Sequence, residues 1–438
     1  SIGNLRSYVF ADTLRRLFEA EGLKVTHVMN ITDVGHLVGD GDEGEDKLEK
    51  GAKKDGKSVW DVAQFYLDAF VADMKQVNVL DPSKLIRATD ALDSQISMIK
   101  VLLDKDYAYI TPEAIYFDVT KLEDYGILTG QRLADKQIGV RDEVVTETNK
   151  RNPQDFAVWF FTVGHFADHQ MHWQSPWGDG FPGWHLECSA IIEQALGKTI
   201  DIHTGGIDNL GTHHVNEMAQ SEAAHEGAPL ANYWMHVLHL HVDGTKMSKS
   251  LDNFYTLDQL TEKGYSPLAL RLLILQAHYR SELNFTFASL RAAQTRLSEL
   301  YGWACLQYDE RTLPSSGYNA DSIDSQLQQI KDALADDLAT PKAFSLLSGM
   351  IDTILGVPAQ HHQHFIDLLH SLDELFGLNL ANQQDITPQQ KQLIAERTAA
   401  KKAGTFKKAD DIRDQLLKQN IELLDTPQGT RWKRKAIL

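Results

Sequence analysis

Cysteine is scarce in this chain: only Cys188 and Cys305 occur among 438 residues. Two cysteines are too few for a disulfide framework and are typical of the reducing cytosol, so we predict a cytoplasmic location. Long apolar runs are missing too, since no uncharged apolar stretch approaches the ~18 residues that a membrane span requires. The first six residues mix charged and apolar side chains and do not form the apolar block of a signal peptide. The composition therefore argues against a membrane-embedded protein, and we expect no membrane partner.

Positive charge is in deficit, with 43 Lys and Arg against 61 Asp and Glu and a net charge of −18. Taken over the whole chain, this balance argues against a protein that holds nucleic acid through its overall charge. The deficit is uneven, because the last 48 residues, from Lys391, carry 12 basic and 6 acidic side chains. A small basic module therefore follows an acidic body of 390 residues with a net charge of −24.

Hydrophobic periodicity predicts that the chain opens on a helix, with apolar residues from Leu5 to Phe18 at helical spacing. Residues 24–32 follow as a predicted buried strand. Because a strand normally precedes the first helix in parallel α/β folds, we expect this sequence to begin inside a domain. Further along we predict a solvated loop or exposed helix at 40–57, a helix at 59–79, strands at 108–111 and 115–119, loop-borne chemistry at 152–253 and helices at 266–380.

A basic pentapeptide, Lys246-Met247-Ser248-Lys249-Ser250, follows the turn signal Asp243-Gly244. Lys246 and Lys249 would place two ammonium groups on a mobile loop that closes on phosphates. A solvated basic loop is the alternative, although a specified match of five residues arises by chance with odds on the order of one in ten thousand. Ile2-Gly3-Asn4 opens the first helix, where free N–H groups and the dipole favour an anion.

A possible metal site consists of Cys188, His213 and Glu217. His213 and Glu217 are four residues apart in a helical stretch, 212–220, so their side chains share one face. One thiolate, one imidazole and one carboxylate suit zinc and leave a position for an exchangeable ligand. Taken alone, the residues favour the alternative of a buried cysteine, a satisfied histidine and a solvated glutamate.

Two further segments lie between these elements. The paired glycines Gly205 and Gly206 would let a planar ligand approach the backbone, and Asp208 would receive an ammonium or hydroxyl group. Ordinary turns are the alternative for the glycines, and a core position is the alternative for Trp184.

Together these stretches resemble the class I aminoacyl-tRNA synthetases, and specifically the cysteinyl-tRNA synthetase family, nearly from end to end. Residues 246–250 reproduce the signature K-M-S-K-S, and residues 1–4 resemble the signature H-I-G-H in a variant that ends in Asn. The cysteine-specific features are Asn30–Asp33, Pro182–Ala190, His213–His214 with Glu217, Tyr233–His236 and His278–Ser281. Residues 427–432 resemble the anticodon-binding tail of the family.

The resemblance implies that Cys188, His213 and Glu217 are protein ligands of one Zn²⁺ ion per chain, which binds the sulfur of the substrate cysteine. Zinc lowers the pKa of a thiol and binds thiolate far better than a hydroxyl, so serine is rejected without an editing domain. The family's fourth ligand is a cysteine on a strand ahead of the first signature, and no residue of this chain corresponds to it. The first His of that signature is replaced by Ser1. We therefore expect the amino-terminal strand to be missing from this sequence and the activity of the chain to be impaired if the sequence is complete.

The resemblance also assigns the substrates, which are cysteine, ATP with Mg²⁺, and cysteine tRNA. The residues around the amino acid are expected to be Thr32, Trp184, His203 and Asp208, with Asp208 holding the ammonium group. The residues that bind ATP are expected to be Ile2, Gly3, Asn4, Gly205, Gly206 and Lys249. Lys246, Lys249 and Asn4 are the expected catalytic residues, because the cysteine carboxylate attacks the α-phosphorus and catalysis consists of positioning and electrostatics. Arg431 and Trp432 are expected to contact the tRNA.

The predicted fold is α/β: a Rossmann-like parallel-sheet catalytic domain with an inserted subdomain, followed by a helical bundle and a small mixed anticodon-binding domain. The expected boundaries are 1–90 and 152–235 for the halves of the catalytic domain, 91–151 for the inserted connective subdomain, 236–310 for the stem-contact region with the K-M-S-K-S loop, 311–385 for the bundle and 386–438 for the basic tail. We expect a monomer.

Two alternatives to a cysteine–tRNA ligase remain open. One is the related ligase that joins cysteine to an amino-sugar conjugate in thiol biosynthesis, although it lacks an anticodon domain, and residues 391–438 speak against it. The other is a catalytically impaired or dead tRNA-binding paralogue, which the absent histidine and cysteine favour.

Overall fold

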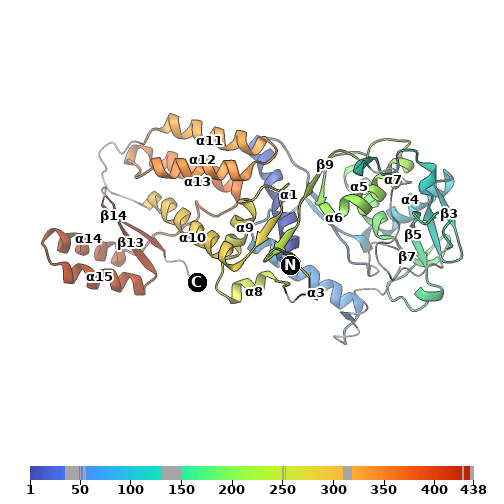
Figure 1. Ribbon diagram of the computed structural model, residues 1–438, viewed down its shortest axis with the longest axis horizontal. Coiled ribbons are helices and arrows are strands. Elements are labelled where there is room, and N and C mark those ends of the chain that lie inside the picture. Colours follow the sequence, from blue (N-terminus) through green and yellow to red (C-terminus); the bar gives the residue numbers. More distant parts are fainter. Residues whose placement is uncertain are drawn as a thin grey trace. The chain divides into compact units, whose positions relative to one another are not determined.

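The computed structural model describes residues 1–34, 49, 51–52, 56–130, 149–248, 251, 253–308, 318–426 and 429–434. The chain forms two compact units by its internal contacts. The first comprises Ser1–Val25, Asp73–Leu80 and Leu238–Leu438, and the second comprises Thr26–Ala72 and Asp81–Val237. Both mix helices with small sheets, as the predicted α/β class requires (Figure 1).

The second unit is built around a five-stranded antiparallel sheet of order β3-β4-β5-β7-β6. Its strands are β3 (Ala108–Ile110), β4 (Ala114–Phe117), β5 (Phe156–Phe161), β6 (Trp173–Ser175) and β7 (Gly178–Pro182). The central strand β5 is buried along its whole length, because both faces of the sheet are covered by apolar clusters. The sheet joins strands from both sides of the expected boundary at residue 151.

Two parallel strand pairs complete the second unit. β1 (Val28–Ile31) pairs with β2 (Lys84–Arg87) across α3 (Val59–Gln76), and β8 (Ile200–Gly206) pairs with β9 (Ala231–Val237). The expected strand over 24–32 is wrong in extent, since only 28–31 find a partner, and it is not wholly buried because Asn30 is exposed. The helices α4 (Leu92–Asp104), α5 (Trp184–Leu196), α6 (Ile207–Asn209) and α7 (Val215–Ala224) belong to this unit, together with the π-helix η6 (Leu210–His214).

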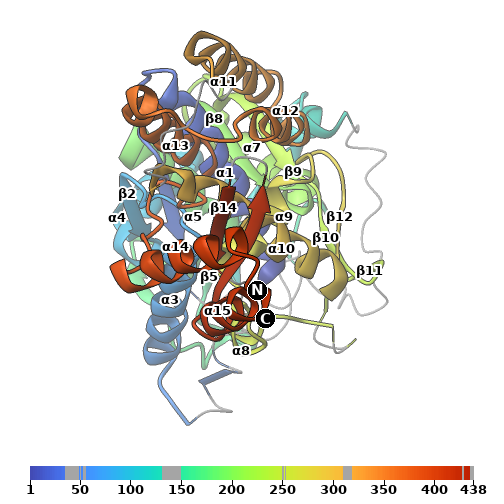
Figure 2. The same ribbon diagram turned by 90° about the vertical axis from the view of Figure 1, so that its left-hand side faces the viewer.

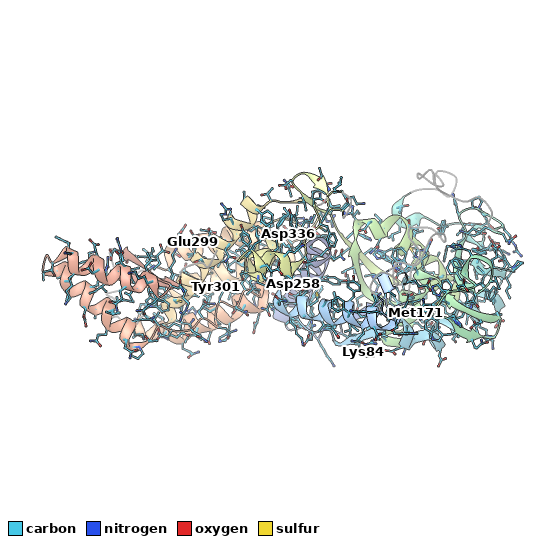
Figure 3. All side chains as sticks on the ribbon, turned by 90° about the horizontal axis from the view of Figure 1, so that it is seen from below. Lys84, Met171, Asp258, Glu299, Tyr301 and Asp336 are labelled. Atoms are coloured by element: carbon cyan, nitrogen blue, oxygen red, sulfur yellow. The ribbon has the colours of Figure 1, made fainter. Side chains whose placement is uncertain are left out.

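The first unit contains the opening helix α1 (Ile2–Ala20). It also contains a helical region in which α11 (Ala320–Ala335), α12 (Thr340–Thr353) and α13 (His362–Phe376) lie side by side (Figures 1 and 2). The predicted helices over 5–18, 59–79 and 266–380 are thus confirmed, apart from the short strand β12 (Leu283–Phe285). Residues 309–317 lie outside the described residues. The helices are α8 (Leu257–Glu262), α9 (Pro267–Leu275), α10 (Phe287–Ala304), α11 (Ala320–Ala335), α12 (Thr340–Thr353) and α13 (His362–Phe376). Tyr301 on α10, labelled in Figure 3, donates its hydroxyl to the carbonyl of Leu378, 3.0 Å away.

A three-stranded sheet of order β11-β10-β12 lies in the first unit, with β10 (Leu240–Val242) parallel to β12 (Leu283–Phe285) and antiparallel to β11 (Thr245–Lys246). The carboxy-terminal part pairs β13 (Ile421–Thr426) with β14 (Gly429–Arg434) beside α14 (Pro388–Lys402) and α15 (Phe406–Lys418) (Figure 2). The 3-10 helices are η1 (Ala88–Ala91), η2 (Val119–Lys121), η3 (Ile127–Thr129), η5 (Gly164–Phe166), η8 (Cys305–Tyr308) and η9 (Ala359–His361).

A buried ionic cluster holds α1 in place. Asp12 Oδ2 lies 2.7 Å from Arg16 Nε and 2.5 Å from Arg271 Nη2, and none of the three side chains is more than 6% exposed. Burial alone would raise the pKa of Asp12, but the two guanidinium groups outweigh it and the net shift is downward. The carboxylate is therefore charged and binds α1 to α9. Among the described helices, none combines the length and apolar character of a membrane crossing.

Candidate active site

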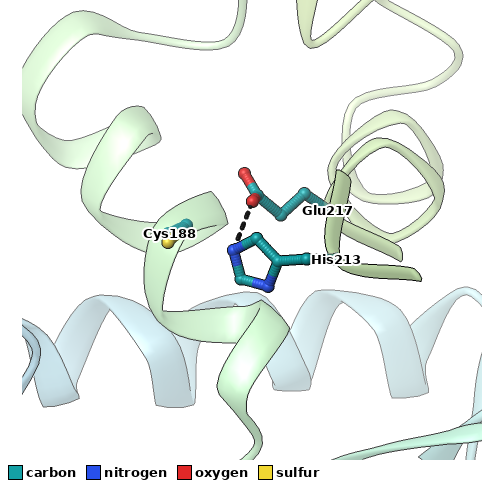
Figure 4. A group of neighbouring side chains, drawn as sticks. All are labelled: Cys188, His213 and Glu217. Atoms are coloured by element: carbon teal, nitrogen blue, oxygen red, sulfur yellow. Dashed lines mark ion pairs between the residues drawn. The ribbon is translucent and has the colours of Figure 1, made fainter. Parts of the chain in front are cut away.

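Three side chains, from α5 and from the consecutive helices η6 and α7, converge in the second unit. Cys188 lies on α5, His213 is in the π-helix η6, and Glu217 is in the first turn of α7. Their ligand atoms lie within 4.8 Å of one another, and all three side chains are buried (Figure 4). The imidazole of His213 and the carboxylate of Glu217 point toward each other, with Nε2 and Oε1 2.6 Å apart. The predicted sharing of one face by these two residues is confirmed, although the helix includes a π turn at His213.

The chemistry of this group fits a divalent cation. Glu217 is 0% exposed, and its Oε1 has no hydrogen bond although His213 Nε2 is close by. Burial and the carboxylates of Glu217 and Glu187 raise the pKa of Cys188 well above its usual value, so a thiolate here requires a positive charge beside it. Sulfur, nitrogen and carboxylate oxygen are the donors that zinc takes in proteins. The group is therefore a possible metal site.

Histidines surround Glu217 on its other side. His203 Nε2, from β8, lies 2.7 Å from Glu217 Oε2, and His203, His214 and Glu217 form a second group that could hold a metal. Burial would raise the pKa of Glu217, but the charges of His213 and His203, together with the hydrogen bond from His203, reverse the shift and lower the pKa well below its usual value. The carboxylate is thus ionised and shared by the two groups.

Several side chains that support His213 lie outside the predicted site residues. His185 Nδ1 lies 2.9 Å from His213 Nδ1, and Gln220 Nε2 donates to the hydroxyl of Ser189 at 2.7 Å and to the carbonyl of His185. His185 and Ser189 belong to the cysteine-specific segment 182–190, so the family resemblance already pointed to the part of the sequence that contains them. Nothing in the local sequence singles out Gln220, since its role follows from the packing of α7 on α5.

The predicted amino-acid residues have different surroundings. The Trp184 ring is stacked on His213, with centroids 4.4 Å apart, and His203 bonds Glu217, so both belong to the buried group. Thr32 is exposed after β1, where Asn30 Nδ2 lies 3.5 Å from its hydroxyl and donates to Cys188 Sγ at 3.3 Å. Asp208 is exposed in the short helix α6. The structure therefore brings Trp184 and His203 to the possible metal site.

The paired glycines lie at the carboxyl end of β8. A Cβ on Gly205 would lie 2.5 Å from Cε1 of His214, which leaves no room for a side chain. The packing of His214 therefore requires a glycine at position 205, and the contact of Gly205 and Gly206 with a ligand stays a prediction.

Three of the predicted ATP-binding residues belong to the first unit. Ile2, Gly3 and Asn4 form the first turn of α1, and the hydroxyl of Ser1 accepts from the Asn4 N–H at 3.3 Å. The N–H of Ile2 donates to the carbonyl of Tyr255 at 3.0 Å. Fewer N–H groups are therefore open to an anion than the sequence suggests.

Lys246 is exposed at the end of β11, after a tight turn at Asp243-Gly244 with positive φ at both residues, as predicted. Lys249 and Ser250 lie outside the described residues. Asn253, which no sequence motif indicates, shapes the preceding segment: its side chain donates to the carbonyl of Lys246 at 3.2 Å and accepts from the N–H of Ser248 at 2.8 Å.

The predicted tRNA residues lie on β14. Part of the Trp432 side chain packs against the apolar cluster of Ile386, Ile412, Leu416 and Ile421, and Arg431 is half-buried beside it. The ring of Trp432 is therefore only partly available for stacking with a base.

The catalytic-domain model of the class I (C) tRNA synthetases matches residues 1–295. A Burkholderia lata protein named cysteine–tRNA ligase 1 is 43% identical over 98% of this chain and 88% of its own length, and a Treponema denticola cysteine–tRNA ligase is 38% identical over 99% and 92%. A Mycobacterium tuberculosis methionyl-tRNA synthetase with methionyl-adenylate has a similar fold, with a TM-score of 0.61, 12% identity and coverage of 87% of this chain and 89% of that one.

Proposed function

Because the chain belongs to the cysteine branch of the class I tRNA synthetases, we propose that it is a cysteine–tRNA ligase. In this proposal it activates cysteine with ATP to cysteinyl-adenylate and transfers the cysteinyl group to the 3′ end of cysteine tRNA. The observation that carries the proposal is the buried donor set of Cys188, His213 and Glu217, within 4.8 Å of one another. Such a set is suited to recognising a thiol.

Cys188, His213 and Glu217 would hold one Zn²⁺ ion. When bound, zinc supplies a positive charge that favours a thiolate ligand over a hydroxyl, and so favours cysteine over serine. Around this site Glu217 orients His203 through its 2.7 Å contact, and Asn30 donates to Cys188 Sγ. The stacked Trp184 ring covers one face of His213 and keeps water from it. Thr32, Trp184 and His203 would surround the amino acid, and Asp208 would accept its ammonium group.

The activation step needs positive charge where the cysteine carboxylate attacks the α-phosphorus and pyrophosphate leaves. Lys246, Lys249 and the first turn of α1 would supply it, with Asn4 in that turn, while Mg²⁺ accompanies ATP. Gly205 and Gly206 would lie beneath the adenosine. Arg431 and Trp432 would contact the tRNA. The cytoplasmic location and monomeric state inferred from the sequence belong to the same proposal.

The test is cysteine-dependent exchange of pyrophosphate into ATP, followed by charging of cysteine tRNA. We expect exchange with cysteine at least about 100-fold above serine, because a site built for one polar group strongly rejects the other. Binding of tRNA without exchange would instead support a catalytically dead paralogue. Exchange without charging, together with ligation of cysteine to an amino-sugar conjugate, would support the thiol-biosynthesis ligase.

A further inference from the structure

A buried arginine lies one turn after the first residues of α1. Arg6 is 2% exposed, and its guanidinium donates to three main-chain carbonyl oxygens: His239 at 2.5 Å, His278 at 3.2 Å, and Ser281. All of these residues lie in the first unit. The arginine therefore joins α1 to two separate segments of the chain.

Those segments form the root of the strand pair that leads to Lys246. His239 directly precedes β10, and its carbonyl also accepts from the N–H of Leu283, the first residue of β12. β10 then turns into β11, which ends at Lys246. Arg6 thus holds the point from which the hairpin of β10 and β11 extends.

Three other contacts bind α1 to the same region. A Cβ on Gly3 would lie 2.8 Å from Cε of Met247, so Met247 packs directly on the first turn of the helix. The N–H of Ile2 donates to the carbonyl of Tyr255. One turn after Arg6, Phe10 is stacked on Tyr279 at a centroid distance of 4.7 Å. The hairpin is therefore attached to α1 at its root, at Met247 and beyond its end.

Burying this charged guanidinium costs free energy, whereas burying an apolar side chain in its place would not. Burial lowers the pKa of Arg6 to about 10, partly opposed by the charge of Glu282, so the group stays charged at neutral pH. Its three bonds go to main-chain oxygens rather than to a carboxylate. Such a group fixes geometry, because three carbonyls from two segments must keep their places to satisfy it.

We propose that Arg6 is a positioning residue for nucleotide activation: it fixes the hairpin that carries Lys246 to the helix whose first turn carries Ile2, Gly3 and Asn4. This inference rests on the proposed function, in which Lys246 and that turn act together on the phosphates. Stabilisation of phosphate charge depends on placement, and a shift of about 1 Å at such a site costs up to about 100-fold in rate.

The test compares Arg6→Lys with Arg16→Lys. Arg16 is a matched control, since it lies on the same helix, is buried and also donates to main-chain carbonyls, those of Asn78, Asp373 and Glu374, away from the hairpin. In pyrophosphate exchange we expect Arg6→Lys to lower kcat/KM for ATP at least about 10-fold while KM for cysteine changes less than twofold. Arg16→Lys should lose thermal stability without this selective loss. Equal kcat/KM for ATP in Arg6→Lys and the wild type would overturn the proposal.

Amide hydrogen exchange separates this inference from the proposed function. The peptide 238–248 includes the N–H groups of Leu238 and Asp243, which bond to the carbonyls of Tyr279 and Phe285. We expect these amides to exchange at least about 10-fold faster in Arg6→Lys and unchanged in Arg16→Lys. Unchanged exchange in Arg6→Lys refutes the attachment, whether or not the protein is active. If the wild type shows no cysteine-dependent activity but Arg6→Lys loosens this peptide, the proposed function fails and the attachment stands.

Discussion

Glu217→Gln is the substitution that most directly tests the candidate metal site. The change keeps the shape of the side chain and removes the charge of a carboxylate that is 0% exposed and contacts His213 and His203 at 2.6 and 2.7 Å. Because the pKa of Glu217 is held well below its usual value, the wild-type group is ionised across the neutral range. The variant therefore differs in charge at every pH at which the protein is assayed.

The expected magnitude follows from the number of donors. Mutating outer partners of metal ligands costs about 10–100-fold in metal affinity, so loss of one of three ligands should raise the zinc Kd at least about 100-fold. At free zinc of about 1,000 times the wild-type Kd, binding stabilises the folded protein by about 4.1 kcal/mol, and a 100-fold higher Kd leaves about 1.4 kcal/mol. The zinc-dependent rise in Tm should therefore shrink to about a third.

The assay measures zinc affinity by competition with a chromophoric chelator, and Tm with and without zinc. Glu222→Gln is the matched control, because Glu222 lies on the same helix and bonds the N–H of Leu230 outside the donor set. We expect the control to bind zinc like the wild type. A Glu217→Gln protein with wild-type zinc affinity would refute the assignment of this carboxylate as a ligand.

Three further predictions concern other parts of the chain. Asn253→Ala should lower kcat for pyrophosphate exchange about 10-fold with unchanged zinc content, since it loses the bonds that shape Lys246 to Ser248; unchanged kcat would contradict this. Trp432→Ala should weaken tRNA binding in a filter assay and leave cysteine activation intact, and equal loss in both assays would argue against a tRNA role. Asp12→Asn should destabilise the protein by about 3–5 kcal/mol in denaturant titrations, because Arg16 and Arg271 lose their buried counter-charge. Because folding lowers the pKa of Asp12, the extra stability of the wild type over Asp12→Asn should be fully present above the unfolded pKa of about 4 and should shrink as the pH falls below it. A stability difference that does not change with pH would count against the ionic cluster.

The helices of this fold were predictable because their signal is local. Apolar side chains at helical spacing marked α1 and α3 to within a few residues. The strand expected over 24–32 was too long, because its limits depend on β2, Lys84–Arg87, which lies more than 50 residues later and was not predicted. Pairing with a distant segment decides where a strand ends, and no local pattern records it.

The candidate site likewise has residues that the sequence predicts and contacts that it does not. Motif resemblance selected Cys188, His213 and Glu217, and their ligand atoms do lie together. Resemblance could not predict that His214 fills the space beside Gly205, or that Asn253 shapes the segment after β11. Both are contacts between side chains and backbone segments brought together by folding, so they follow from packing rather than from spacing.

The basic tail shows how a charge count and a charged surface differ. Its residues carry more positive than negative charge, but Arg397 and Lys401 are both bonded to Asp425, and Arg397 is almost fully buried. These hydrogen bonds lower the pKa of Asp425, with the bond from Arg397 the largest cause, so the aspartate stays ionised and anchors the hairpin to α14. Exposed lysines remain on α14 and α15, at Lys402, Lys407, Lys408 and Lys418, and Phe406 at the start of α15 is 64% exposed. Phosphate contacts require accessible cations, so the count of basic residues overstates the charge that this domain presents to a nucleic acid.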